Sequence, residues 1–204
     1  MPHQARAVAT RHAVLMAAAT VFERKGYAAS AISDIVAEGG VTRGALYFHF
    51  ESKEDLARAI IGEQQAWIAR LQPQEDPPLQ AAVDISYAFI QELADSVLMR
   101  ASLRLTVEQG TFGPAGARTY HAWADCAEAI FERARQMGHL RPGWVPRELA
   151  LMCTSAVTGL ELSSTALDAR RDLTRRLQLF WKALLPGIAT AEQVAAIRIG
   201  PPSP

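Results

Sequence analysis

The chain has few of the residues that build disulfide-stabilised folds or catalytic sites. Its 204 residues include two cysteines, Cys126 and Cys153, which make no disulfide framework and lack CxxC metal spacing. We expect both to be buried thiols on helices, as free cysteines usually are. The five histidines form no HExxH pair, and no GxSxG motif, Walker loop or dinucleotide fingerprint occurs. The sequence therefore predicts no metal, no cofactor and no catalytic residue.

Long apolar runs and an excess of charge of one sign are also missing. The N-terminus has no apolar signal segment and no apolar run is long enough to span a bilayer, so we expect a cytoplasmic protein with no membrane partner. Apolar residues make up 50% of the chain, enough for one substantial core and a small module. The 21 basic residues balance 21 acidic ones, whereas nucleic-acid-binding domains are often strongly basic.

Two short helical patterns meet at a pair of glycines in the segment Gly26–Leu56, GYAASAISDIVAEGGVTRGALYFHFESKEDL. Ser30 is placed to cap the first helix, which we expect from residue 31 to about 38. Gly39 and Gly40 should end that helix, because glycine adopts the left-handed backbone without steric cost.

The second helix of this segment should be capped by Thr42 and run from residue 43 to about 48. Ser52, with Asp55 three residues later, is expected to begin a third helix. Two helices joined by a tight glycine turn make a helix-turn-helix, whose second helix fits the major groove of B-DNA. The alternative interpretation is a connector turn packed by aromatic side chains.

The side chains of the second helix suit contact with DNA. Gly44 and Ala45 are nearly bare, so that the backbone can approach phosphates and base edges. Arg43 offers a guanidinium fork suited to guanine or to a phosphate. Leu46 and Phe50 should face the core beneath. The predicted DNA-binding residues are Ser33, Thr42, Arg43, Gly44, Ala45, Tyr47, His49 and Lys53.

Because the net charge is zero, positive charge at a DNA site must be local. Arg6, Arg11, Arg43, His49 and Lys53 fall in segments that could share one face. Lys53 also begins a helix, where an amine and a backbone amide suit a phosphate. Neutralised phosphates make binding fall steeply with salt, whereas a neutral surface would bind DNA weakly and almost independently of salt.

The rest of the chain is predicted to be helical, with breaks at proline and glycine. QPQEDPP, residues 72–78, should end the helix that begins at Ser52, and residues 110–116 should form a flexible loop. The remaining helices are expected at about 7–25, 52–71, 79–94, 96–109, 119–137, 147–167 and 170–185, with a short turn at 192–197. The expected fold is all-α, with a helix-turn-helix DNA-binding domain at 1–52 and a helical ligand-binding and dimerisation bundle at 53–204.

The last two long helices have faces suited to a partner helix. One has a broad apolar stripe, and the other repeats small residues at every fourth position. These residues are Leu173, Leu177, Phe180, Trp181 and Leu184 on the later helix, and Ser155, Gly159 and Ser163 on the earlier one. Two copies of the chain would then pair as a four-helix bundle about a two-fold axis. The alternative is that both stripes belong to the core of one chain.

Aromatic and polar side chains in the second part of the chain suggest a ligand pocket. An apolar cavity with a few hydrogen-bonding groups is the usual form of a small-molecule site. The predicted ligand-binding residues are the aromatics Tyr87, Phe89, Tyr120 and Trp123 and the polar residues Gln64, Thr154 and Thr158. Alternatively, the tryptophan packs in an ordinary core and the threonines bond their own backbone carbonyls.

The run GYAASAISDIVAEGGVTRGALYFHFESKEDLA resembles the N-terminal domain of the TetR family of bacterial transcriptional repressors. Within it, VTRGALYFHF followed by SKEDLA is most similar to the γ-butyrolactone receptor branch of actinobacteria. The upstream residues 6–7, 10–11, 17–19 and 21–22 also fit that branch. The motif covers the N-terminal part of the chain; beyond it the likeness is looser and is carried by Trp123 and its spacing to Gly159.

The resemblance implies a repressor that binds double-stranded operator DNA as a homodimer. A small inducer of γ-butyrolactone, butenolide or furan type would release it and so control antibiotic genes. In those receptors a tryptophan packs on the ligand, and a glutamine and a threonine bond to ligand oxygens; Trp123, Gln64 and Thr158 match them. Two other interpretations stay open: a regulator of the same fold that has lost or changed its ligand, and an α-bundle enzyme acting on a small lactone.

Overall fold

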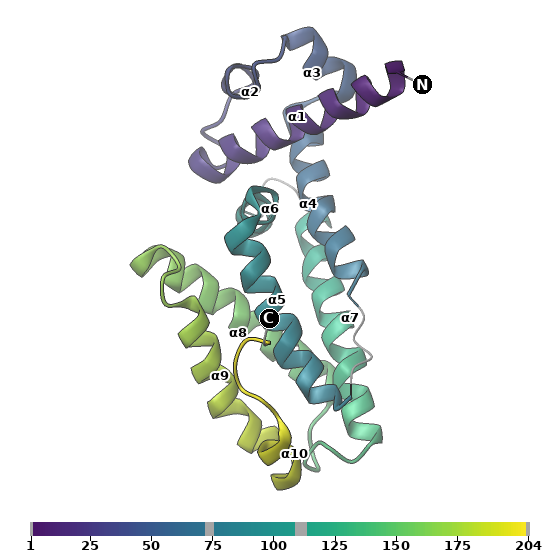
Figure 1. The fold of residues 1–204 in the computed structure, drawn as a ribbon, viewed down its shortest axis with the longest axis vertical. Helices are drawn as coiled ribbons and strands as arrows, with labels where there is room; N and C mark the ends of the chain where they lie inside the picture. Colours follow the sequence, from purple (N-terminus) through teal and green to yellow (C-terminus); the bar gives the residue numbers. More distant parts are fainter. Residues whose placement is uncertain (1, 72–75, 109–113, 203–204) are drawn as a thin grey trace. The chain divides into compact units, whose positions relative to one another are not determined.

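The structure is a computed structural model that describes residues 2–71, 76–108 and 114–202. These residues fold into helices joined by turns and short loops (Figure 1). Within the described ranges the β-type pairing is limited to an isolated bridge between Leu140 and Ala189. The expected all-α fold is confirmed.

The helices are α1 Pro2–Lys25, α2 Ile32–Gly39, α3 Arg43–His49, α4 Lys53–Ala69, α5 Pro78–Asp95, α6 Val97–Val107, α7 Pro114–Gln136, α8 Pro146–Asp168, α9 Leu173–Ile188 and α10 Ala191–Ala196. The chain divides into two compact units. Unit 1 comprises Met1–Ala69 and Asp95–Thr119, and unit 2 comprises Arg70–Ala94 and Tyr120–Pro204. Compactness thus groups α4 and α6 with the N-terminal helices, and a functional boundary after residue 52 stays a prediction.

The core of unit 1 forms around α1. Leu15, Ala18, Ala19 and Phe22 point inward and are buried, as the helical spacing predicts. Two alanines in the middle of this face let neighbouring helices approach closely, and α1 packs against α2 and α6. Gly26 ends α1 with a φ of 76°, and its amide donates to the carbonyl of Phe22 at 2.8 Å.

The residue that caps α2 differs from the one predicted. The Ser30 hydroxyl does not cap the helix but donates to the carbonyl of Tyr27 at 2.8 Å, in the turn before it. Ala31 is the N-cap residue of α2, and its amide donates to the Asp34 carboxylate at 3.0 Å. The Asp34 carboxylate takes the capping role because the Ser30 hydroxyl is already hydrogen-bonded within the preceding turn. Gly40, with a φ of 58°, ends α2 as expected.

The start of α4 agrees with the predicted cap in part. The Ser52 hydroxyl accepts from the amide of Asp55 at 3.0 Å, but the Asp55 carboxylate accepts from Glu51 rather than from Ser52. The helix ends at Ala69, two residues before the expected end.

Helix α5 contributes a broad buried face to unit 2, while Ala88, Gln91 and Ala94 on its other side are exposed. From α9 the indole of Trp181 donates to the buried hydroxyl of Ser86 at 2.8 Å. Leu173 and Leu177 of α9 are buried as well. For these three residues of the predicted partner stripe the alternative holds, because they belong to the core of their own chain. Phe180 and Leu184 are half-buried.

Further helix boundaries differ from expectation, and α1 already begins at Pro2 rather than at about residue 7. Pro114 begins α7, so residues 114–116 of the predicted loop are helical, because proline fits the first turn of a helix. Residues 110–113 of that loop, and 72–75 of the predicted break, lie outside the described residues. Ala169 and Arg170 have positive φ angles of 55° and 68°, which delays the start of α9. The helix then continues through Pro186, which costs it a backbone hydrogen bond near its end.

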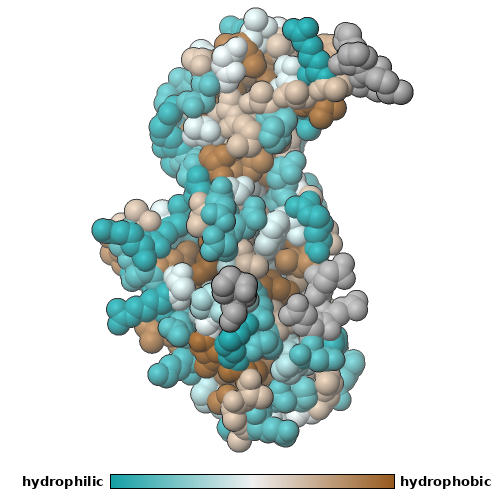
Figure 2. Space-filling view, in the orientation of Figure 1, coloured by the Kyte–Doolittle hydropathy of each residue, from teal (hydrophilic) through white to brown (hydrophobic). Residues whose placement is uncertain are grey.

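The two cysteines lie on helices as predicted, but only one is fully buried. Cys153 is buried on α8, and burial raises the pKa of its thiol to about 12. Cys126 on α7 is half-buried, with a pKa raised for the same reason. No helix in the described ranges combines the length and the apolarity that a membrane crossing needs. The face drawn in Figure 2 is mostly hydrophilic, with small hydrophobic areas between polar side chains.

Replacing Trp181 with phenylalanine should lower the free energy of unfolding by about 2–4 kcal/mol, because the buried Ser86 hydroxyl loses its donor and the smaller ring leaves a cavity in the core. Urea unfolding at fixed protein concentration measures this change. Trp144→Phe is a matched control, since that indole donates to the carbonyl of Gly187 at 3.0 Å but is 37% exposed. Water can replace the exposed donor, so the control should lose roughly 0.5 kcal/mol or less. Equal losses in the two variants would contradict the argument.

Candidate DNA-binding and ligand-binding sites

Helix α3 is held in unit 1 by its cap and by two buried side chains. The Thr42 hydroxyl accepts from the amide of Ala45 at 3.1 Å, as predicted. Leu46 and Phe50 are buried in the core of unit 1, also as predicted. The inward face of the helix is therefore fixed, and its opposite face is available for contact.

The outward face of α3 carries residues from two successive turns. Arg43 and Gly44 are exposed, and Tyr47 and Phe48, four residues later, are 46% and 77% exposed. Of the other predicted DNA-binding residues on this helix, Ala45 and His49 are half-buried. The structure thus places most of the predicted residues of α3 on one accessible surface. Phe48 lies on the same surface and was not among the predicted residues.

Gly44 is not required by the fold of unit 1. A Cβ atom built on it would meet, among the described residues, only the Thr42 hydroxyl oxygen at 4.0 Å. Glycine within a helix is nevertheless less favourable than alanine by about 0.5–1 kcal/mol. A bare backbone at an exposed position that has room for a side chain suits close approach by a partner.

Lys53 is tied into unit 1. Its ammonium donates to the carbonyls of Tyr27 at 2.8 Å and of Ser30 at 2.7 Å, and it lies 4.1 Å from the centre of the Tyr27 ring. Partial burial lowers the pKa of the amine. Lys53 therefore fixes the turn between α1 and α2, and its predicted contact with a phosphate stays a prediction.

The remaining basic and polar candidates lie on α1 and α2. Ser33 and Arg6 are exposed. Arg11 lies with its guanidinium 4.9 Å from the centre of the Phe50 ring, a cation–π contact between α1 and the residue that ends α3. Arg11 thus connects the two helices while it remains exposed.

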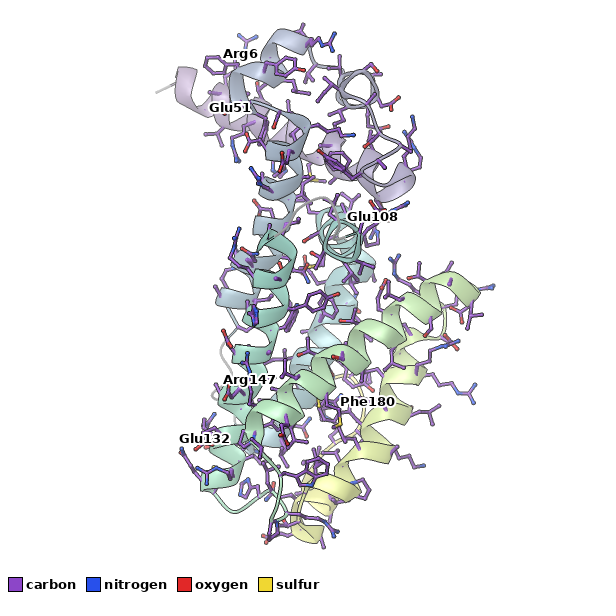
Figure 3. All side chains as sticks on the ribbon, turned by 180° about the vertical axis from the view of Figure 1, so that it is seen from behind. Arg6, Glu51, Glu108, Glu132, Arg147 and Phe180 are labelled. Carbon is purple, nitrogen blue, oxygen red and sulfur yellow. The ribbon has the colours of Figure 1, made fainter. Side chains whose placement is uncertain are left out.

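The turn after α1 is clasped by side chains of α6, within unit 1. Arg104 donates to the carbonyl of Glu23 at 2.6 Å and pairs with Glu108 at 2.8 Å. The other oxygen of Glu108 accepts from the amide of Tyr27 at 2.9 Å (Figure 3 labels Glu108). A Cβ atom at Gly26 would lie 2.6 Å from Glu108 Oε1. We call these contacts of Arg104 and Glu108 with the end of α1 the α6 clasp.

The predicted ligand-binding residues fall in both units, and Gln64 is the one in unit 1. Gln64 is 1% exposed, and its side-chain oxygen accepts from the Ser102 hydroxyl of α6 at 2.9 Å. One turn further along α6, the buried hydroxyl of Thr106 has no hydrogen-bond partner among the described residues. Between α4 and α6 the core of unit 1 is thus partly polar.

In unit 2 the structure brings two of the predicted aromatics together. Phe89 of α5 and Trp123 of α7 make an edge-to-face contact, with ring centres 4.9 Å apart. Trp123 and Tyr120 are half-buried, and burial raises the pKa of Tyr120. Aromatic rings on these two helices therefore form part of the interior of unit 2.

Tyr87 is the second buried hydroxyl without a partner. It is 3% exposed, and its hydroxyl has no hydrogen-bond partner within the described part of the chain. Burial raises its pKa, and the charge of Arg198 acts in the opposite direction. A buried hydroxyl is normally satisfied, so this one is suited to a hydrogen bond with a bound molecule.

Of the two threonines of α8, Thr158 behaves as the alternative interpretation predicts. Thr158 donates to the carbonyl of Thr154 at 2.9 Å, one turn earlier in the same helix. Both are half-buried. The Thr158 hydroxyl is therefore explained by the helix itself, and a role of either threonine in ligand binding stays a prediction. The described residues contain no group of three or more histidine, cysteine or acidic side chains placed to hold a metal ion.

Comparison with known proteins gives consistent results. Residues 14–60 match the family of bacterial regulatory proteins of the tetR family. The A-factor receptor protein of Streptomyces griseus is 37% identical over 198 residues, which are 97% of this chain and 70% of the receptor.

Solved structures extend the similarity to the whole fold. The TetR regulator TylP of Streptomyces fradiae is 31% identical, with a TM-score of 0.82 over 96% of this chain and 93% of its own. A structure of an ArpA-like γ-butyrolactone receptor is 29% identical, with a TM-score of 0.82 over 94% of each chain.

Replacing Gly44 with alanine should make the protein more stable and a poorer DNA binder. The added methyl group favours the helix by about 0.5–1 kcal/mol but stands between the α3 backbone and DNA. Thermal unfolding and a fluorescence-anisotropy titration with duplex DNA measure the two effects. Gly62→Ala on α4 is the control, because a Cβ there has room as well and meets no described residue within 4 Å. It should gain stability without loss of DNA binding; a similar loss in both variants would exclude a special role for Gly44.

Proposed function

Because this chain belongs to the TetR family of bacterial regulators, in the branch of the γ-butyrolactone receptors, we propose that it is a ligand-released repressor. It would bind operator DNA through α3 and leave it when a small signalling molecule of γ-butyrolactone type binds. The observation that carries this proposal is the similarity to the A-factor receptor along almost the whole chain. Control of antibiotic genes follows from the same similarity.

The accessible face of α8 supports a homodimer. Its residues at intervals of three and four, Met152, Ser155, Gly159, Leu162 and Ala166, are all exposed. A Cβ atom at Gly159 would meet no described residue within 4 Å, so a second helix can approach closely there. An exposed strip with this spacing has the pattern of a helix-packing seam.

On α9 the exposed residue Leu179 adds apolar surface of the same kind. We propose that these faces of α8 and α9 pair with the same faces of a second copy, about a two-fold axis. The dimer surface is then distinct from the stripe of Leu173, Leu177 and Trp181, which the chain uses for its own core. Two copies would hold two α3 helices for the two half-sites of an operator.

The ligand is proposed to bind in unit 2, where Tyr87 offers a buried hydroxyl and Trp123 an aromatic face. Such a site combines apolar surface with a few hydrogen-bonding groups, as a lactone with an apolar chain requires. A ligand changes DNA binding only if it favours one arrangement of the protein over another. DNA must then weaken ligand binding by the same factor.

The α6 clasp supports a route from that site to α3. Along the chain α5, which carries Tyr87, is followed directly by α6, with Ser96 between them as the α6 cap. At its other end α6 grips the Gly26–Tyr27 turn that leads into the helix-turn-helix. Lys53 holds the same turn from the start of α4. A shift of α6 on ligand binding would therefore be passed to the orientation of α2 and α3.

Native mass spectrometry of the full chain with an operator-like duplex tests the proposal. A complex of two chains and one or more duplexes should form, and A-factor or an extract of a producing culture should dissociate it. The mass of the retained ligand identifies the inducer. A protein that binds DNA but is not released by any of these would be a regulator with a lost or changed ligand. A protein that ignores DNA would contradict the proposed function.

Trp123→Ala should leave operator binding intact and abolish release by the inducer found in that experiment. Coupling between ligand and operator usually changes affinity by about 5–150-fold, and the variant should show less than about twofold. Operator affinity measured with and without inducer gives this ratio. Trp144→Phe, a change outside the proposed site, serves as the control. Normal release from Trp123→Ala would place the ligand site elsewhere.

Glu108→Gln should reduce the coupling without touching either binding site. The substitution keeps the size of the side chain but removes the charge that pairs with Arg104 and binds the Tyr27 amide. Inducer affinity for the protein alone, followed by tryptophan fluorescence, should be unchanged, while the coupling ratio should fall by roughly fivefold or more.

Glu54→Gln is the matched control for this change, because Glu54 also belongs to unit 1 but pairs with Arg58 on the surface of α4. It removes the same charge and should leave the ratio unchanged. If both variants keep the wild-type ratio, the α6 clasp does not transmit the ligand signal.

A further inference from the structure

Phe48 stands out on the surface of unit 1. At 77% it has the highest exposed fraction of the large apolar side chains in the described ranges. It belongs to α3, which is already anchored in the core by the buried side chains of Leu46 and Phe50. Burying a phenylalanine is worth about 1.5–3 kcal/mol, and the free protein leaves most of this gain unused.

The ring of Phe48 has a defined neighbour. It lies edge-to-face with the ring of His49, with centres 4.9 Å apart and an interplanar angle of 86°. His49 is half-buried, so the contact supports the phenyl ring from the protein side and leaves its outer face open. The exposed ring is thus positioned by its neighbour and points to a partner outside the chain.

The surroundings of Phe48 on α3 are those of a base-reading surface. Gly44 lies one turn earlier on the same face and has no side chain, and Arg43 and Tyr47 flank this face. A helix with a bare turn beside an exposed phenylalanine can bring the phenyl ring to the floor of the major groove. The base edges in that groove offer a single apolar group, the 5-methyl group of thymine.

We propose that Phe48 reads thymine in the operator by packing its ring against this methyl group. The inference rests on the proposed function, since it assumes that α3 enters the major groove. It adds a sequence preference that does not depend on hydrogen bonds. Phosphates and deoxyribose lie along every duplex, so a contact with them would give Phe48 no such preference.

Deoxyuridine provides the test, because it differs from thymidine only in lacking the 5-methyl group. An operator is first selected from random duplexes with the full-length protein, and each thymine is then replaced singly by deoxyuridine. For the wild type, one thymine position in each half-site should be sensitive, with a loss of affinity of about threefold to tenfold. Placing a cytosine–guanine pair there should weaken binding, and 5-methylcytosine should recover part of the loss.

Phe48→Ala completes a double-mutant cycle. The variant should bind the thymine operator more weakly than the wild type and should no longer distinguish thymine from deoxyuridine at the sensitive position. Because Phe48 is exposed, the variant should keep the wild-type circular dichroism and melting temperature. Met137→Ala, an exposed apolar residue just after α7 that lies in neither proposed binding surface, is the control for loss of apolar surface and should keep the methyl effect.

The outcomes separate this inference from the function on which it rests. A wild-type protein that tolerates deoxyuridine at every position overturns the reading of thymine by Phe48. So does a Phe48→Ala variant that loses the same factor on thymine and deoxyuridine duplexes. Neither result affects the proposal of a DNA-binding repressor. A protein that selects no duplex at all overturns the proposed function and this inference together.

Discussion

The orientation of the DNA-binding helices in unit 1 depends on how one short turn is held. Gly26 and Tyr27 leave α1, and their neighbouring main-chain groups are bonded by ionised side chains from two other helices, Arg104 and Glu108 of α6 and Lys53 of α4. Hydrogen bonds to charged groups are stronger than those between neutral ones. The turn is therefore a firm joint between α1, α4 and α6, and α2 and α3 follow directly from it.

Much of the fold could be predicted because its signals are local. Helical spacing identified the buried face of α1, the cap at Thr42 identified the start of α3, and Leu46 and Phe50 proved to be its anchors in the core. The α6 clasp had no such signal, since Tyr27 and Glu108 lie 81 residues apart in the chain. The same holds for Lys53, whose amine looked free for a phosphate but bonds carbonyls more than twenty residues earlier.

When a helix has apolar side chains on more than one face, its sequence does not show which face packs in the core of its own chain and which packs against a second chain. The stripe of Leu173, Leu177 and Trp181 satisfies the pattern of a dimer seam as well as that of a core. Only the burial of these side chains within one chain and the bond from Trp181 to Ser86 decide between them. The small residues of α8 were recognised by their spacing, and Ser155 and Gly159 are exposed, whereas Ser163 is half-buried. Ligand contacts are harder still, since Thr158 bonds within its own helix.

The close fit of Gly26 under Glu108 has a consequence for divergence within the family. The backbone there is left-handed, and a methyl group would collide with the Glu108 carboxylate, so two separate constraints disfavour a side chain while the α6 clasp is in place. A lineage that shortened residue 108 would relieve the contact with the carboxylate, but Arg104 Nη2 would still lie 2.8 Å from the added Cβ atom and the backbone would stay left-handed. Positions 26 and 108 should therefore vary together among relatives, with asparagine as the tolerated replacement for glycine wherever the acidic residue is lost.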